Sequence, residues 1–270
     1  MRITDWDVAY QNSAFIPDAD RIAAGWARDT AAFRAGHPPQ VIRYGSGQRQ
    51  VIDVFRPDHE ERGLTVFVHG GYWQMLSGPE VSHLAAGPLA HGQVVAVPSY
   101  TLAPAATIAE IVTEMARALT LLAQEVDGPI RLVGHSAGGQ LVTRLVCIGA
   151  LPDAVAERVA HVVSIAGVHD LRPLLRTAMR ETLHLTPETA AAESPALLQP
   201  RPGVCLTAMV GAQERPEFIR QTDLLANIWT GLGADCQAIH LPGHNHFSML
   251  EELADPDGAI TQAVLAATSD

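Results

Sequence analysis

The chain has 270 residues, of which 47% are hydrophobic and 17% charged, so it is long and apolar enough for a globular protein with a sizeable core. Its formal net charge at pH 7 is −11, with 18 Lys and Arg against 29 Asp and Glu. This acidic balance, without a basic run, excludes nucleic acid and anionic membrane surfaces as expected partners.

The N-terminal stretch MRITDWDVAYQNSAF is charged and lacks the apolar core of a secretory signal. No run approaches the roughly 18 consecutive apolar residues of a membrane span. We therefore expect a cytoplasmic protein. Cys147, Cys205 and Cys236 are widely spaced and form no metal-binding pattern, which predicts free thiols.

The first predicted element is a helix over residues 17–36, where apolar residues recur at helical spacing after an acidic start. Two strands, residues 40–45 and 50–57, follow around the turn SGQR. From Leu64 onward, short valine-rich runs alternate with longer helical stretches. The predicted strands are LTVFVHG, QVVAVPSY, PIRLVGHS, HVVSIAGV, GVCLTAMVG and CQAIHLPGH, and the predicted helices are 106–126, 137–150, 216–231 and 258–268.

This alternation indicates an α/β fold with a mostly parallel central sheet and helices on both faces. No repeat, low-complexity tract or linker divides the chain, so residues 1–270 are expected to form a single domain. Residues 171–199 are the longest interruption between strands. An insertion at the ligand-binding edge of a sheet commonly covers the site, so this segment is the predicted small helical cap.

The segment RLVGHSAGGQLV places Gly134-His135-Ser136-Ala137-Gly138 between a strand and a helix. This G-x-S-x-G pattern is a nucleophile elbow, in which glycines let the two backbones approach and the serine projects at a helix N-terminus. Ser136 is therefore the candidate nucleophile. The alternative interpretation is a glycine-rich turn with an idle serine.

A serine hydroxyl needs a base to take its proton, and in this arrangement the base follows late in the chain. His244 and His246 both come after the last predicted strand, and His246 is chosen because it directly precedes the helix-like segment FSMLEEL. The His-x-His pair could instead bind a metal ion. No further ligands are recognisably spaced, so we expect neither a metal nor a cofactor.

The acid that orients the base should follow the strand VCLTAMVG, and Glu214 is the first carboxylate there. Glu217 lies one helical turn later and is expected to point outward. Asp170, after HVVSIAGV, remains an alternative, because some enzymes of this kind carry the acid one strand earlier.

The stretch VFVHGGYWQM then has a use, because the bare backbone of Gly70 and Gly71 can direct N–H groups at an oxyanion, together with the N–H of Ala137. Tyr72 and Trp73 follow immediately. They are predicted to narrow the acyl pocket or to stack on an aromatic substrate, with core packing as the alternative.

HGG (69–71), SYTLAP (99–104) and GHSAGG (134–139) resemble the esterase/lipase α/β-hydrolases. YQNSAFIPDA, HGGYW, GVHDLRPLLRT, AESP, ERPEFIRQ and HFSMLE resemble more narrowly the serine-type kynurenine formamidases, or arylformamidases, from about Tyr10 to about Glu252. The resemblance implies Ser136, Glu214 and His246 as nucleophile, acid and base. Two positions depart from it: Glu214 stands where Asp is frequent, and Arg180, in the predicted cap, stands where Asn is expected.

The expected function is a cofactor-free serine hydrolase that cleaves a small acyl or formyl group from an ester or aromatic amide, with N-formylkynurenine as a candidate substrate. A general short-chain carboxylesterase is the first alternative, and a non-catalytic binding protein on the same scaffold is the second. The expected partner is a small-molecule acyl substrate. Arg180 could bind a carboxylate on it, such as the amino-acid end of N-formylkynurenine, although an exposed arginine without this role is the alternative. A homodimer is left open.

Overall fold

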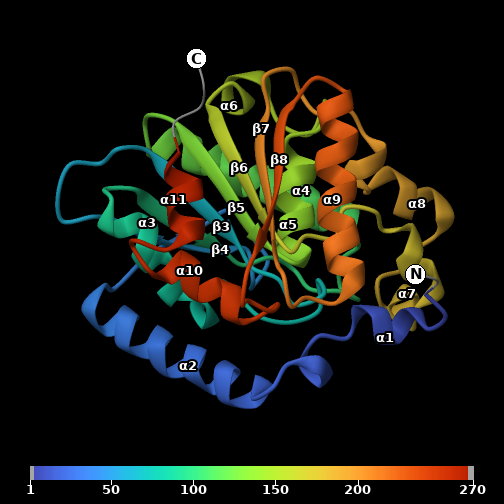
Figure 1. Ribbon diagram of the computed structural model, residues 1–270. Helices are drawn as coiled ribbons and strands as arrows, with labels where there is room; N and C mark the ends of the chain where they lie inside the picture. The colour runs from blue at the N-terminus through green and yellow to red at the C-terminus, as the bar shows by residue number, and fades with distance from the viewer. Residues whose placement is uncertain (1–2, 267–270) are drawn as a thin grey trace.

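The computed structural model describes residues 3–266 and is built around an eight-stranded sheet (Figure 1). The strand order is β1-β2-β4-β3-β5-β6-β7-β8, in which β2 pairs antiparallel with both β1 and β4 and every other pair is parallel. The strands are β1 (Gln40–Arg43), β2 (Val51–Phe55), β3 (Leu64–Val68), β4 (Val94–Pro98), β5 (Ile130–His135), β6 (Val159–Ile165), β7 (Cys205–Gly211) and β8 (Asp235–Leu241). Each predicted strand is present, and the predicted mostly parallel sheet is confirmed.

Helices cover both faces of this sheet (Figure 1). The predicted long helices are α2 (Ala19–Gly36), α4 (Ile108–Glu125), α5 (Ala137–Leu145), α9 (Pro216–Gly231) and α11 (Ala259–Leu265). The short ones are α1 (Trp6–Tyr10), α3 (Ala86–Ala90), α6 (Asp153–Ala156), α7 (Met179–Thr182), α8 (Pro187–Ala192) and α10 (Glu251–Ala254). Single 3₁₀ turns are η1 (Ser13–Phe15), η2 (Gly78–Glu80), η3 (Ser82–Ala85), η4 (Arg172–Arg176), η5 (Pro195–Leu197) and η6 (Ser248–Leu250). Helices α3, α10 and α11 pack together on one face, and α4, α5 and α9 lie on the other.

The burial of each strand follows its place in the sheet. All residues of β3 and β4 are buried, whereas the edge strands β1 and β8 expose most of theirs. Covered on both faces, the inner strands need continuous apolar side chains, and valine suits the pleated backbone. Because β3, β5, β7 and β8 are parallel, their carboxyl ends meet at one edge, where ligands bind in open α/β sheets.

Local sequence explains where the long helix α4 begins. The Thr107 hydroxyl accepts a hydrogen bond from the Glu110 N–H at 3.3 Å, and the Glu110 carboxylate accepts one from the Thr107 N–H at 2.7 Å. This reciprocal pair satisfies two N–H groups that a helix end otherwise leaves free. Buried apolar residues then recur three or four positions apart along one face, at Ile108, Ile111, Met115, Leu119 and Leu122.

Helix α2 is present as predicted, but it lies apart from the sheet and crosses the lower side of the molecule in Figure 1. Of its 18 residues only Thr30 is buried. The Thr30 hydroxyl lies 2.6 Å from His83 Nδ1, and Arg34 forms an ion pair with the buried Asp53 of β2. The helix is therefore attached by these polar contacts together with two partly buried aromatic residues, Trp26 and Phe33, which pack against Phe247 and Phe55.

Within residues 3–266 no helix combines the length and the hydropathy needed to cross a membrane. The last predicted helix, 258–268, corresponds to α11, and its final two positions lie outside the described residues.

Candidate active site

Ser136 occupies the turn between β5 and α5 with a backbone conformation of φ 55° and ψ −115°. A side-chain-bearing residue in such a region costs about 1–3 kcal/mol and persists only when its surroundings hold it. Here the Ser136 N–H donates to the Ile165 carbonyl of β6 at 2.8 Å, and its carbonyl accepts from the Gln140 N–H of α5. The serine is thus fixed at the carboxyl edge of the sheet, where the motif predicts it.

The spacing of the elbow glycines has a direct steric cause. A Cβ on Gly134 would lie 2.1 Å from the Gly138 carbonyl oxygen, and one on Gly138 would lie 2.0 Å from the Val68 carbonyl oxygen. No side chain fits at either distance. The two glycines let β5, α5 and the end of β3 meet backbone to backbone.

His246, after β8, and Glu214, after β7, are brought together. His246 Nδ1 lies 2.5 Å from Glu214 Oε1, and the two side chains are 4% and 1% exposed. Two further contacts hold His246: His135 Nε2 donates to its backbone carbonyl at 3.0 Å, and the Phe218 ring centroid lies 4.6 Å from that of the imidazole. With Nδ1 engaged by the carboxylate, Nε2 is the nitrogen left for chemistry.

The alternative residues lie elsewhere. The Asp170 carboxylate accepts from Nε and Nη2 of Arg172, at 2.9 and 3.0 Å, and is not in contact with His246. His244 Nε2 lies 3.3 Å from Glu252 Oε1. The structure therefore pairs each of these alternatives with a partner of its own.

The expectation that Glu217 points outward is wrong. This residue is 1% exposed, and its carboxylate accepts from the Tyr10 hydroxyl at 2.8 Å and from Arg220 Nη2 at 2.7 Å. Helix α1 covers it, and the sequence offered no signal for that contact, because Tyr10 lies 207 positions earlier in the chain.

The oxyanion loop, defined as residues 69–76, packs directly on the serine turn. A Cβ on Gly70 would lie 3.0 Å from Ser136 Cβ and 2.9 Å from the His135 carbonyl oxygen. Among residues 3–266 no acceptor takes the backbone N–H of Gly70, Gly71 or Ala137. Free N–H groups beside the nucleophile are what an oxyanion hole requires.

Trp73 does not line a substrate pocket, and that prediction is wrong. Gly71, Tyr72 and Trp73 have φ values of 95°, 54° and 58°, so three successive left-handed residues turn the indole inward. Trp73 is 1% exposed, and its Nε1 donates to Gln140 Oε1 of α5 at 3.1 Å. Core packing, the alternative interpretation, is correct for Trp73, whereas Tyr72 does border the cavity described next.

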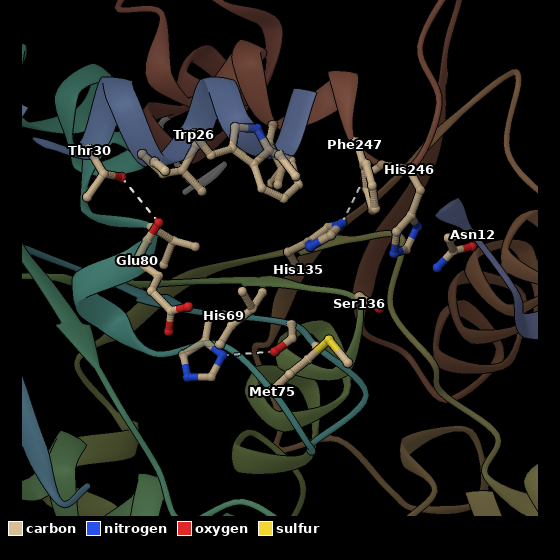
Figure 2. Close-up of a pocket in the computed structure, with 18 of the residues that line it drawn as sticks. Asn12, Trp26, Thr30, His69, Met75, Glu80, His135, Ser136, His246 and Phe247 are labelled. Atoms are coloured by element: carbon tan, nitrogen blue, oxygen red, sulfur yellow. Dashed lines mark hydrogen bonds between the residues drawn. The ribbon is translucent and has the colours of Figure 1, made fainter. Parts of the chain in front are cut away.

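A cavity of about 740 Å³ opens beside Ser136 and His246 (Figure 2). Trp26 and Phe247 approach edge to face at 5.1 Å on its wall. Other apolar residues that line it are Phe67, Met75, Leu84 and Leu250. This volume falls in the range of drug-sized ligand sites. This volume belongs to the whole cavity, so a narrow acyl side bordered by Tyr72 stays a prediction.

Two histidines on the cavity wall are neutral at pH 7. Burial lowers the pKa of His69 to about 4, and its ring stacks on Tyr100 at 4.3 Å. Burial, and next the proximity of His246, hold the pKa of His135 well below its ordinary value. Neither imidazole places a positive charge beside Ser136 at this pH.

The α/β-hydrolase fold family matches residues 65–249, which span β3 to the turn after β8 and include every candidate residue above except those of the N-terminal segment. The chain belongs to this family. The pattern of a strand, an elbow serine, and an acid and a histidine after later strands is what the family shares.

Several relatives of this α/β-hydrolase are known. The kynurenine formamidase of Salmo salar is 29% identical over 235 residues, covering 83% of this chain and 80% of that protein. The kynurenine formamidase of Danio rerio is 28% identical at the same coverage. A crystal structure from Silicibacter sp. TM1040, described as a candidate thioesterase, is 41% identical and covers 96% of this chain and 98% of its own, with a TM-score of 0.92. An esterase from Pyrobaculum calidifontis shares the fold, with a TM-score of 0.71 at 18% identity, 96% coverage of this chain and 94% of its own.

The cap of the hydrolase is not where the sequence predicted it. No residue of 171–199 lines the 740 Å³ cavity, because this segment packs beside α1 and α9. Met179 borders a smaller hollow of about 350 Å³ beyond Tyr72, and Arg180 is exposed to solvent. The cavity is instead roofed by α2, whose Trp26 and Thr30 are seen above it in Figure 2.

Helix α2 and Asn12 belong to the wall of this hydrolase's cavity, a place that no sequence motif predicts for them. One signal was available for α2: Ala19, Ala23, Ala27 and Ala31 repeat every fourth residue, and all four line the cavity. A helical face of small residues leaves space beside it instead of filling a core. Asn12 lies within the quoted motif YQNSAFIPDA, but nothing in the motif assigned it a role.

Residues 3–266 contain no group of three or more His, Cys, Asp or Glu side chains arranged to hold a metal ion. His244, one half of the His-x-His pair considered for metal binding, is engaged with Glu252 instead.

Proposed function

We propose that this α/β-hydrolase removes a formyl or small acyl group from an aromatic amide or ester by covalent catalysis. Ser136 acts as the nucleophile, His246 as the base and Glu214 as the acid that orients it. The observation that carries the proposal is the 2.5 Å contact between His246 Nδ1 and Glu214, on the wall of the cavity that Ser136 also lines.

In the first half of the reaction, Ser136 Oγ attacks the carbonyl carbon while His246 Nε2 takes the hydroxyl proton. The negative charge that develops on the carbonyl oxygen is stabilised by the N–H groups of Gly70, Gly71 and Ala137. The tetrahedral intermediate collapses when His246 returns that proton to the leaving amine or alcohol. The product of this half is an acyl-serine.

Water completes the cycle. His246 removes a proton from a water molecule, the hydroxide adds to the acyl-serine, and the same N–H groups stabilise the second oxyanion. The intermediate then expels Ser136, which regains its proton from His246, and formate or a short carboxylic acid leaves. The Glu214 carboxylate keeps the imidazole in one orientation and stabilises its protonated form throughout.

The cavity supports an aromatic leaving group. Its volume of about 740 Å³ far exceeds the need of a formyl or acetyl group, and Trp26 and Phe247 offer aromatic surface. The kynurenine formamidase relatives support the same substrate class, with N-formylkynurenine as the first candidate. A general short-chain carboxylesterase is the alternative, which the shared fold of the esterases leaves open.

Rates on N-formylkynurenine and p-nitrophenyl acetate, measured side by side with the purified protein, test the proposal. We expect both to be hydrolysed, with a higher kcat/KM for the formamide. Hydrolysis of the ester alone would favour the carboxylesterase, and hydrolysis of neither would contradict the proposal. Phenyl thioacetate belongs in the same panel, because the 41% identical structure is described as a candidate thioesterase.

Glu214→Gln is expected to lower kcat by about 10³–10⁴-fold, because the amide no longer stabilises the protonated imidazole. Asp170→Asn is the matched control and should leave kcat within about threefold, since Asp170 contacts Arg172 rather than His246. Steady-state rates of both variants on p-nitrophenyl acetate decide the comparison. A larger loss for Asp170→Asn would assign the acid to the end of β6.

Trp26→Ala is expected to raise KM for phenyl acetate by about tenfold, because it removes aromatic surface from the cavity roof. KM for methyl acetate, which has no ring to contact the roof, should stay within about twofold. The control is Arg28→Ala, which changes an exposed residue of the same helix. Equal effects of Trp26→Ala on both esters would place the leaving group elsewhere.

A further inference from the structure

Residues 10–12, which precede the family-matched residues 65–249, contact the oxyanion loop at Tyr72. The Tyr72 hydroxyl donates to the Tyr10 carbonyl at 2.8 Å and accepts a hydrogen bond from Asn12 Nδ2 at 3.1 Å. Asn12 is 3% exposed and lies on the cavity wall (Figure 2). A segment 60 positions away in sequence therefore ends on the loop that carries the oxyanion N–H groups.

The donor and acceptor in each of these hydrogen bonds follow from the chemistry of the groups. The Tyr72 hydroxyl has one proton and gives it to the Tyr10 carbonyl, so its partner at position 12 must be a donor. Asn12 supplies Nδ2, and its buried Oδ1 then has no hydrogen-bond partner among residues 3–266. Leaving a buried acceptor unpaired is unfavourable. The side chain at position 12 is therefore oriented for the contact with Tyr72 rather than for its own full set of hydrogen bonds.

Tyr10 is itself anchored to the helix that follows the acid. Its hydroxyl donates to Glu217 Oε1 at 2.8 Å and accepts from Gln221 Nε2 at 3.1 Å, both on α9. Its ring meets Phe218 edge to face at 5.8 Å, and Phe218 in turn lies against His246. Contacts of Tyr10 with α9 and with Tyr72 thus connect the helix that follows Glu214 to the oxyanion loop.

The loop needs such anchors because its conformation is strained. Tyr72 and Trp73 both have positive φ, which side-chain-bearing residues keep only where neighbouring groups hold them. Trp73 is tied to α5 through Gln140, and its carbonyl accepts from the Ala103 N–H at 2.9 Å. Tyr72 is tied by the hydroxyl contacts to Tyr10 and Asn12. The Tyr100 hydroxyl, which lies 3.1 and 3.2 Å from the His69 and Gly70 carbonyl oxygens, holds the start of the loop, and the anchors at Tyr72 and Trp73 hold its middle.

We propose that Tyr72 and Asn12 are positioning residues of this hydrolase, and that the hydrogen bond between them holds the oxyanion loop in its stabilising conformation. The inference rests on the proposed function. Because the oxyanion exists only on the way to and from the intermediate, a misaimed N–H group weakens binding of the transition state and not of the substrate. The hydrogen bond therefore acts on kcat and leaves KM unchanged.

The test uses Tyr72→Phe, Asn12→Leu and the double variant in the full-length protein. We expect each single variant to lower kcat on p-nitrophenyl acetate by about tenfold or more, with KM within about twofold. Affinity for an aryl trifluoromethyl ketone, which forms an oxyanion on Ser136, should fall by a similar factor. The double variant should lose no more than the worse single variant, because both remove the same hydrogen bond.

Tyr44→Phe is the matched control. Tyr44 is also a buried tyrosine, and its hydroxyl donates to the Ser99 carbonyl at 2.6 Å, but it does not line the cavity. We expect this variant to lower the melting temperature while keeping kcat and ketone affinity. A merely structural role for Tyr72 would produce the same pattern as Tyr44→Phe and would overturn the inference.

The outcomes separate this inference from the proposed function. An active wild type whose Tyr72→Phe and Asn12→Leu variants are equally active overturns the inference alone. Losses that multiply in the double variant overturn it too, because the two side chains then act independently. A wild type that neither hydrolyses the panel nor reacts with a fluorophosphonate overturns the proposed function, and the inference with it.

Discussion

Replacing Ser136 by Ala is expected to lower kcat on every acyl substrate by about 10⁴–10⁶-fold, because no other hydroxyl is proposed to form the acyl-enzyme. The fold should persist, since alanine has the Cβ that already sits at this turn and loses only the oxygen. A fluorophosphonate probe should label the wild type at Ser136 and leave the variant unlabelled. Intact-protein mass spectrometry and a thermal melt on the same samples check both statements.

The matched control is Ser46→Ala, an exposed serine in the turn between β1 and β2. This variant should keep wild-type rates and labelling. Turnover by Ser136→Ala at a rate close to that of Ser46→Ala, or fluorophosphonate labelling of another residue, would show that the nucleophile lies elsewhere. If Ser136→Ala keeps both wild-type rates and labelling, Ser136 is the idle serine of the alternative interpretation.

Replacing His246 by Ala is expected to lower kcat by about 10⁴–10⁶-fold, close to the effect at the serine, because the two residues act as one unit. His244→Ala should change kcat by less than about threefold, since its ring lies against Glu252. Rates on p-nitrophenyl acetate at neutral pH provide the comparison. Added imidazole should restore part of the lost rate in His246→Ala, because the small base can occupy the emptied position beside Glu214.

The reverse ranking of the two histidines would mean that the loop after β8 presents His244 to the cavity. Equal and modest effects of both substitutions would contradict a histidine base altogether. The double variant of Ser136→Ala and His246→Ala sharpens the test, because residues that act as a unit should show no additional loss beyond either single change.

The positions of the candidate catalytic residues could be predicted from sequence because each follows a recognisable strand. The G-x-S-x-G spacing marks Gly134 and Gly138, whose bare backbones let β5, α5 and the end of β3 meet, and valine-rich runs identify buried strands wherever they occur. In a parallel sheet, all carboxyl ends lie at one edge, so a residue that follows a strand can be placed at that edge without knowing which residues surround it. Ser136 is predicted from its motif, and Glu214 and His246 are predicted from their places after the last two strands, with His246 preferred to His244 because it precedes a helix-like segment.

The surroundings of these residues depend on contacts that no local pattern encodes. The helical periodicity of residues 17–36 predicts α2, but contacts with residues distant along the chain, such as Trp26 with Phe247 and Thr30 with His83, place it over the cavity. Residues 171–199 have equally helix-like segments, yet they pack beside α1 and α9 and cover no part of the cavity. The length of an insertion between two strands does not say whether the insertion folds over the cavity or away from it.

The orientation of single side chains was decided in the same way. Trp73 follows the oxyanion glycines, and its position predicts a pocket residue. A left-handed backbone and a hydrogen bond to Gln140 instead direct its side chain into the core. Glu217 reads as an exposed helix residue until Tyr10, from the other end of the chain, covers it. Sequence determines which groups stand at the strand ends, because backbone sterics and strand burial are local. Tertiary structure alone determines what roofs and anchors them, because those contacts join segments that are distant along the chain.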